Sequence, residues 1–333
     1  MPEENFNWKI TGHNYVKEFL ERSITTKNLS HAYLFYGPKN IGKYTLALRF
    51  SQILECQKDK KPCEQCQSCQ YIKKGIHPDI TTIKKKEDKK NIAIEQIREL
   101  QKKLSLNSFS NGYKTAIIDQ AETLSEEGQN SLLKTLEEPT PKTILILVTS
   151  KINQIPETII SRSQVIRFKP ASQNEIAKHL TQNLKVEKNQ AEILASLSFG
   201  RPGRAIRFVE DPHNFAEYKT KANDFLQILS SSISERLKLV DTYTNKKDTF
   251  LEKTNIFQNI LQIWSLIIRD LILIKYNQDN LVNKFLERDL EKIKDSYPCE
   301  KLKNMLISIQ RTQEYLAQNV QAKLTIENLL FHI

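Results

Sequence analysis

The chain has 333 residues, 39% of them hydrophobic and 27% charged, and carries a formal net charge of +11 at pH 7. This length predicts two or three domains with packed cores, and the positive charge favours an anionic partner, nucleic acid first, although a lysine-rich coding bias would leave the same excess. The charged N-terminal segment MPEENFNWKITGHNYV has no apolar core, which excludes a secretory signal peptide and indicates a cytoplasmic protein.

The first thirty residues are predicted to form short helices and a loop, with an apolar helical stripe around residues 16–20. The apolar run at residues 32–36 predicts the first core strand. A glycine-rich turn, GPKNIGKYT at residues 37–45, separates it from a helix over residues 46–54. Strand, turn and helix in this order are the setting of a phosphate-binding loop.

The glycine-rich turn matches the pattern G-x-x-x-x-G-K through Gly37, Gly42 and Lys43. Its backbone N–H groups and the following helix N-terminus would hold phosphates, and Lys43 would reach the β- and γ-phosphates. The next position, where Ser or Thr normally ligates Mg²⁺, holds Tyr44. Thr45 is one residue late, which rotates it by roughly 100° around the helix. The turn therefore predicts a nucleotide site without its metal ligand, and binding of ATP or ADP stays open.

Four of the five cysteines lie close together after this helix, as Cys56, Cys63, Cys66 and Cys69. In a chain without a signal peptide such cysteines are expected to be metal ligands or free thiols. Four thiolates at this spacing can close a tetrahedral zinc site, which would stabilise an insertion at residues 56–69 that is too small for its own core. An iron–sulfur cluster would normally add a further x₃-C-P, and catalytic zinc would keep a position for water.

A strand is predicted at residues 80–83, followed by the charged run KKKEDKK at 84–90 and a helix within 92–106. The charged run is interpreted as a solvated loop. One face of the helix carries basic residues, which would meet either a phosphate backbone or solvent. These basic residues are Arg98, Lys102 and Lys103.

The segment KTAIIDQ at residues 114–120 is predicted to be a strand with an acidic residue at its end. Asp119 is placed where a Walker B carboxylate holds Mg²⁺ through water. The next residue, normally the glutamate that polarises the attacking water, is Gln120, which can hydrogen-bond water but cannot take its proton.

The rest of the first half alternates helices and strands. The segment at 130–139 predicts a helix that ends before proline, and strands follow at 143–149 and 165–168, with Ser-Arg-Ser at 161–163 between them. Strands separated by helices predict a parallel α/β sheet that is covered on both faces.

Beyond residue 168 only helices are expected. Short amphipathic helices fill residues 172–209 and include FGRPGR at 199–204, and everything from 212 to 333 has a helical pattern. The most apolar segment, residues 256–274, is interrupted by polar and charged side chains. It is therefore expected to be a buried helix and not a membrane span.

Several motifs in this order resemble the bacterial clamp-loader subunits of DNA polymerase III, which belong to the AAA+ class. These motifs are HAYLFYGPKNIGK, the four cysteines, HPD, the Walker B strand, NSLLKTLEEP, SRS and GRPGRA. The resemblance covers about residues 8–210. It implies a RecA-like P-loop α/β domain at 1–168, which contains the zinc insertion at 56–69. A helical lid domain at 169–211 and a helical collar domain at 212–333, which assembles the subunits, would follow.

The resemblance also implies partners. These are gamma/tau-like ATPase subunits and a delta-like subunit in a hetero-pentamer, the sliding clamp and primer–template DNA, all in the cytoplasm at the replication forks of the nucleoid. Such complexes use ATP to open the clamp and place it on DNA.

The motor subunits of this family carry Lys-Thr or Lys-Ser in the P-loop and Asp-Glu in Walker B, where this chain has Tyr44 and Gln120. The resemblance therefore implies a subunit of the polymerase holoenzyme without catalysis of its own. Arg162 matches the arginine finger that such subunits insert into a neighbour's ATP site. Arg204 falls at the sensor-2 position. The expected vestigial or weak nucleotide site consists of Gly37, Gly42, Lys43, Thr45, Asp119 and Arg204.

Two alternative functions are compatible with the same sequence. The chain could be an active gamma/tau-like ATPase subunit of the same machine, which the residues at positions 44 and 120 oppose. It could instead be a zinc-containing nucleic-acid-binding protein with a decayed P-loop.

Overall fold

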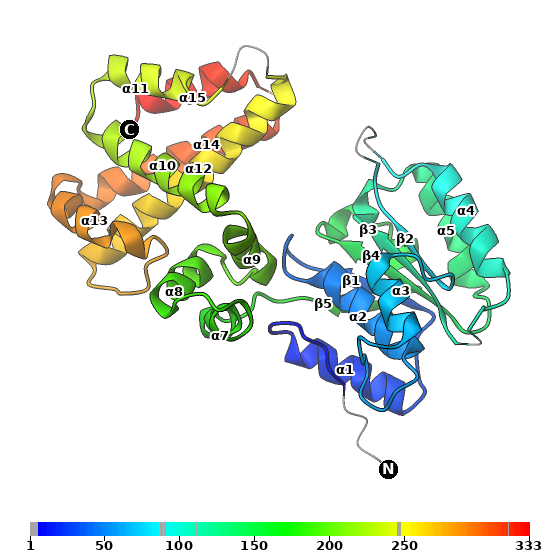
Figure 1. The fold of residues 1–333 in the computed structure, drawn as a ribbon. Coiled ribbons are helices and arrows are strands. Elements are labelled where there is room, and N and C mark those ends of the chain that lie inside the picture. The colour runs from blue at the N-terminus through cyan, green and yellow to red at the C-terminus, as the bar shows by residue number, and fades with distance from the viewer. Residues whose placement is uncertain (1–5, 87–88, 90, 111, 245–247, 319) are drawn as a thin grey trace. The chain divides into compact units, whose positions relative to one another are not determined.

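The computed structural model describes residues 6–86, 89, 91–110, 112–244, 248–318 and 320–333 (Figure 1). Part of the charged run predicted at 84–90 lies outside the described residues. The chain divides into two compact units. The first comprises residues 1–179 and 199–204, and the second comprises 180–198 and 205–333. The three-domain division stays a prediction.

A parallel sheet is the centre of the first unit. Among the described residues five strands form it in the order β2-β3-β4-β1-β5, all parallel, as the alternation of strands and helices predicted. The strands are β1 (Ala32–Tyr36), β2 (Ile80–Ile83), β3 (Lys114–Asp119), β4 (Thr143–Thr149) and β5 (Gln164–Arg167). Because the strands are parallel, the segments that follow β1, β3 and β4 all begin at the same edge of the sheet.

Helices connect these strands, as predicted. The helices of the first unit are α1 (Asn14–Thr25), α2 (Lys43–Glu55), α3 (Gln67–Lys74), α4 (Ile94–Ser105), α5 (Glu126–Glu137) and α6 (Glu157–Ile160). Helix α4 buries Ile97, Leu100 and Leu104 and exposes Arg98 and its other basic residues, so its basic face is open to solvent.

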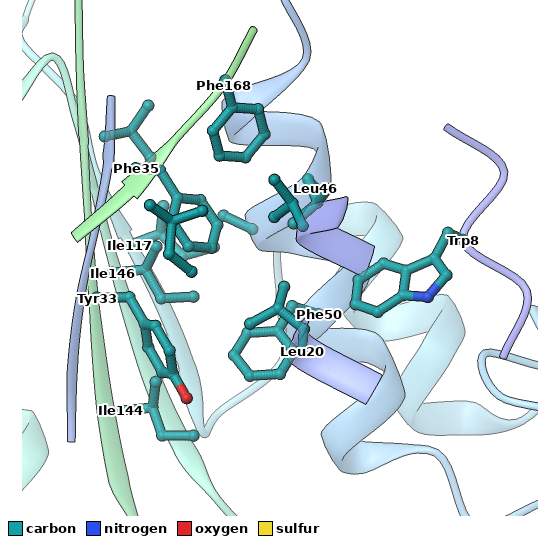
Figure 2. Close-up of a cluster of buried hydrophobic side chains, with 14 of the residues drawn as sticks. Trp8, Leu20, Tyr33, Phe35, Leu46, Phe50, Ile117, Ile144, Ile146 and Phe168 are labelled. Carbon is teal, nitrogen blue, oxygen red and sulfur yellow. The ribbon is translucent and has the colours of Figure 1, made fainter. Parts of the chain in front are cut away.

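Two hydrophobic clusters cover the two faces of the sheet. Successive strand side chains point to opposite faces, so Tyr33 and Phe35 belong to one cluster while Ala32 and Leu34 belong to the other. Figure 2 shows the first cluster, in which the strand residues face Phe50 and other side chains of α1 and α2. Burying an aromatic side chain such as Phe50 stabilises the fold by about 1.5–3 kcal/mol.

The second unit is helical throughout its described residues, as predicted for the region beyond residue 212. Its helices include α8 (Lys188–Leu197), α10 (Pro212–Ser230), α11 (Ile233–Asp241), α12 (Phe250–Lys275), α13 (Glu287–Ile293), α14 (Cys299–Ala317) and α15 (Ala322–Leu330). The division between the units falls within α7 (Gln173–Leu184) and α9 (Pro202–Glu210).

Helix α12 is the core of the second unit. By length and composition it is apolar enough to cross a membrane, but half of its most apolar window is buried, and it packs against α10, α14 and α15. Asp270 within it is fully buried and accepts hydrogen bonds from the backbone N–H groups of Val282 and Asn283, at 3.0 and 2.7 Å. These contacts agree with the predicted buried helix.

Candidate functional site

The glycine-rich loop connects β1 to α2 in backbone conformations that require glycine. Gly37 has a φ of 151° and Gly42 a φ of 101°. A Cβ atom on Gly37 would lie 2.6 Å from the carbonyl oxygen of Phe168, so no other residue fits there without a shift of the backbone. The loop therefore has the local geometry that its sequence pattern predicted.

Lys43 begins α2 and is buried, with 7% of its surface exposed. Its ammonium donates hydrogen bonds to the carbonyl oxygens of Gly37 and Pro38, at 2.6 and 2.7 Å. Burial lowers the pKa of Lys43 to about 8, although the carboxylates of Glu122 and Asp119 act in the opposite direction. The lysine is thus held over its own loop, close to both acidic residues.

Two segments that the motif did not reveal also contact this loop. The ring of His13 lies against Phe168, and its Nε2 is 2.7 Å from the carbonyl oxygen of Ile41. The backbone N–H of Gly203 donates to the carbonyl oxygen of Asn40 at 3.0 Å. A lone histidine at a helix start and a distant glycine carry no local signal of such contacts.

Asp119 ends β3, and burial raises the pKa of its carboxyl group. The cation that opposes this shift most strongly is Lys84, whose Nζ lies 4.0 Å from the centroid of the Tyr44 ring. Gln120 follows with its side chain exposed and a φ of 58°.

These residues do not fit a magnesium ion. The motif position of the metal-binding hydroxyl holds Tyr44, whose ring contacts the Lys84 ammonium, and Lys84 also acts on the Asp119 carboxylate that would hold the metal-bound water. A divalent cation placed there would be repelled by Lys84 and would lack one of its protein oxygens.

Glu122 is a carboxylate at this edge of the sheet that sequence reasoning missed. It accepts hydrogen bonds from the Thr149 and Ser150 hydroxyls at 2.8 and 2.7 Å. Burial alone would raise its pKa, but these hydrogen bonds hold the pKa below its usual range. The contact joins the ends of β3 and β4, which no local pattern encodes.

Not every predicted residue joins this cluster. Lys43 contacts Gly37 and is acted on by Asp119, and Gly42 directly precedes it, whereas Thr45 is exposed on the surface of α2. The guanidinium of Arg204 lies 5.4 Å from the Phe199 ring centroid. The neighbouring Arg201 is among the cations that act on Lys43.

The predicted metal ligands meet in space. The sulfur atoms of Cys56, Cys63, Cys66 and Cys69 all lie within 4.8 Å of one another. Backbone N–H groups of Cys63 and Cys66 donate to the sulfurs of Cys56 and Cys63, at 3.4 and 3.2 Å. The four thiols can therefore hold a metal ion, and a tetrathiolate set fits structural zinc.

The thiols differ in acidity. Burial raises the pKa of Cys56 and Cys69. Burial has the same effect on Cys63, but the N–H groups of Cys66 and Gln65 outweigh it and lower the pKa of that thiol to about 6. The lowered pKa favours the thiolate form of Cys63, which is the form that binds metal.

Arg162 follows the short helix α6 and is accessible, since 39% of its side chain is exposed. Its Nη2 lies 2.9 Å from Oε1 of Glu137, and its Nη1 donates to the carbonyl oxygen of Thr158 at 3.1 Å. An exposed guanidinium held in this way is available to an anion on a second molecule.

Comparison with known proteins gives subunits of bacterial DNA polymerase III among the relatives. A family model described as DNA polymerase III, delta subunit, matches residues 12–172. DNA polymerase III subunit delta' of Bacillus subtilis is 29% identical over 317 residues, which cover 95% of this chain and 94% of the relative. Subunit tau of Bacillus subtilis is 31% identical over 233 residues, covering 68% of this chain and 41% of tau.

Among solved structures, a DNA polymerase III gamma subunit-related protein from Thermotoga maritima aligns over 95% of this chain and 97% of its own. The sequence identity is 19% and the TM-score is 0.47.

Proposed function

Because the chain is a homologue of the delta-prime, gamma and tau subunits of bacterial DNA polymerase III, we propose that it is a delta-prime-like clamp-loader subunit that does not itself hydrolyse ATP. In this role it is a stator: it completes the ATP site of a neighbouring subunit and takes part in loading the sliding clamp onto primed DNA.

The observation that carries the proposal is the replacement of the catalytic groups of the P-loop site. Tyr44 stands where a hydroxyl would ligate magnesium, Lys84 acts on Asp119, and Gln120 cannot accept a proton. Removing a single catalytic group of this kind costs about 3–4 kcal/mol of transition-state stabilisation. Loss of both the metal and the general base supports a site without hydrolysis.

What survives of the site supports weak nucleotide binding at most. The backbone N–H groups between Gly37 and Gly42, together with Lys43, would hold phosphate groups. Lys43 would first have to leave the carbonyl oxygens of Gly37 and Pro38. Any ATP or ADP bound here would lack a protein-held magnesium ion.

Arg162 supplies the function that remains. Its guanidinium is always charged, is exposed, and offers a planar set of donors that matches phosphate oxygens. In the proposed complex it reaches into the ATP site of a gamma/tau-like neighbour and neutralises charge on the γ-phosphoryl group.

The other proposed partners follow from the same role. They are a delta-like subunit that completes the hetero-pentamer, the sliding clamp and primer–template DNA at replication forks in the cytoplasm. The net charge of +11 and the exposed basic face of α4 support a polyanionic partner. We further propose that the four clustered cysteines hold structural zinc.

The decisive test is Arg162→Ala in a clamp-loader complex reconstituted with the full chain. The variant is expected to assemble normally and to lower ATP hydrolysis at the affected site by roughly 10³-fold, as for other arginine fingers. Arg167→Ala, an exposed arginine nearby, is the matched control. Unchanged hydrolysis by the Arg162 variant in an intact complex would refute the finger assignment.

A further inference from the structure

The guanidinium of Arg162 is held at two of its nitrogens by groups from its own chain. Nη2 pairs with Oε1 of Glu137 at 2.9 Å, and Nη1 donates to the carbonyl oxygen of Thr158 at 3.1 Å. An arginine side chain has four rotatable bonds, and two contacts at its tip remove most of that freedom. The charged group is therefore presented in one orientation.

The carboxylate that holds it comes from a well-anchored element. Glu137 is the last residue of α5, which is capped at its start by the Ser125 side chain and buries Leu132 and Leu136 in the sheet-covering core. Helix α5 packs against α6, which precedes Arg162. The position of Glu137 is thus fixed by the core and not by the loop that carries the arginine.

The placement of this carboxylate is not explained by helix stability. The C-terminus of a helix carries partial negative charge, so a glutamate there is unfavourable for the helix. Glu137 and Glu138 both lie at this end, and only for Glu137 does the described structure record an ion pair. Exposed ion pairs contribute little to folding. A role in orienting Arg162 accounts for Glu137 better than a role in stability.

The contacts leave the arginine able to act. A guanidinium has five N–H donors, and Glu137 and Thr158 engage two of them. The remaining three suffice for a two-point contact with phosphate oxygens. The pair is also accessible, with 39% of the Arg162 side chain and 50% of the Glu137 side chain exposed.

We propose that Glu137 is a positioning residue that orients Arg162 for insertion into the neighbouring subunit's ATP site. This inference rests on the proposed function of Arg162. Holding a charged group in its working geometry before the partner arrives removes an ordering step from the reaction, and a displacement of about 1 Å can cost 10²-fold in rate. Glu137 would act only through Arg162 and would not touch the nucleotide.

The test compares Glu137→Ala with Glu138→Ala in the reconstituted complex, with ATP as substrate. Glu138 is exposed on the same helix end, which makes it a matched control. Glu137→Ala is expected to lower kcat about tenfold with KM for ATP unchanged, because orientation matters in the transition state and not for binding. Glu137→Gln, which keeps an oxygen acceptor without the charge, should fall between wild type and Glu137→Ala.

The coupling between the Glu137 and Arg162 substitutions tests whether Glu137 acts through Arg162. In an Arg162→Ala background, Glu137→Ala should cause no further loss of kcat, since the residue it positions is gone. Assembly of each variant complex, measured by size-exclusion chromatography, controls for folding.

The possible failures are distinguishable. If Arg162→Ala is harmless, the proposed finger falls and this inference falls with it. If Arg162→Ala is damaging but Glu137→Ala is neutral or faster, or if Glu138→Ala costs as much, only the positioning role is overturned.

Discussion

Lys43 is a buried lysine, and burial disfavours the charged form of its ammonium group. Its pKa is lowered to about 8 by that burial, in spite of the carboxylates of Glu122 and Asp119 nearby. Two backbone carbonyl oxygens of its own loop accept its hydrogen bonds. Its charge therefore makes the stability of the first unit depend on pH.

The sign of this dependence follows from proton counting. The unfolded chain, in which the pKa of Lys43 returns to 10.5, binds more protons than the folded chain between pH 8 and 10. Below pH 8 the buried charge of Lys43 lowers the free energy of unfolding by its full amount. Stability is expected to recover as the pH rises from 8 to 10, by about 1–2 kcal/mol.

Lys43→Met should remove this recovery. The measurement is urea unfolding at pH 8, 9 and 10, followed by the fluorescence of Trp8 in a Trp264→Phe background. Trp8 lies in the core of the first unit. Lys39→Met serves as the control. Equal pH dependence in the Lys43 variant and its parent would contradict the expected charge effect.

At the level of single residues the sequence predicted what a local motif encodes. Gly37, Gly42 and Lys43 are placed by one continuous pattern, and Asp119 by its position at a strand end. His13, Lys84 and Glu122 could not be found in this way. They reach the site from segments far apart in the chain, and their partners are set by how the sheet assembles.

At the level of elements, the cysteine insertion at residues 56–69 is expected to depend on metal binding for its stability. Between the end of α2 at Glu55 and the start of α3 at Gln67 no helix or strand is described. The four cysteine sulfurs lie within 4.8 Å of one another beside this segment, and Cys69 comes from the first turn of α3. Metal binding by the four thiols would therefore be coupled to the folding of this segment.

One zinc ion per chain is the expected result of elemental analysis of protein purified without chelator. Cys66→Ser should weaken metal binding by roughly 100-fold or more, since it removes one of four thiolates. It should also expose the insertion to protease, detected by mass spectrometry of the fragments. Cys299→Ser, far from the cluster in sequence, is the control. Stoichiometric iron, or wild-type resistance in the Cys66 variant, would contradict a zinc-stabilised insertion.

Hydrophobic periodicity was sufficient for the elements themselves. The strands at residues 32–36, 80–83 and 143–149 agree with the predicted ranges, because short apolar runs between turn signals have few alternatives. The association of residues 199–204 with the first unit could not be predicted. It depends on contacts such as that of Gly203 with Asn40, which join segments distant in sequence.

At the scale of the whole molecule, motor subunits combine two properties: they contribute residues to an ATP site and they hydrolyse ATP. The proposed role keeps the first property and lacks the second. The purified chain alone, with ATP and magnesium, is expected to release phosphate no faster than buffer. The physical reason is that Tyr44 and Gln120 stand at the motif positions of the magnesium ligand and the general base. A gamma/tau-type ATPase assayed in parallel is the positive control. Steady magnesium-dependent turnover, retained through purification, would support an active ATPase instead.

The burial of α12 has a consequence for how the protein must be made. Two of the helices that pack against it, α14 and α15, follow it in the sequence and are therefore synthesised after it. Before both helices are synthesised, the nascent chain exposes a segment that is long and apolar enough to cross a membrane. Truncation of the chain directly after α12 is therefore expected to leave this apolar surface exposed and to promote aggregation.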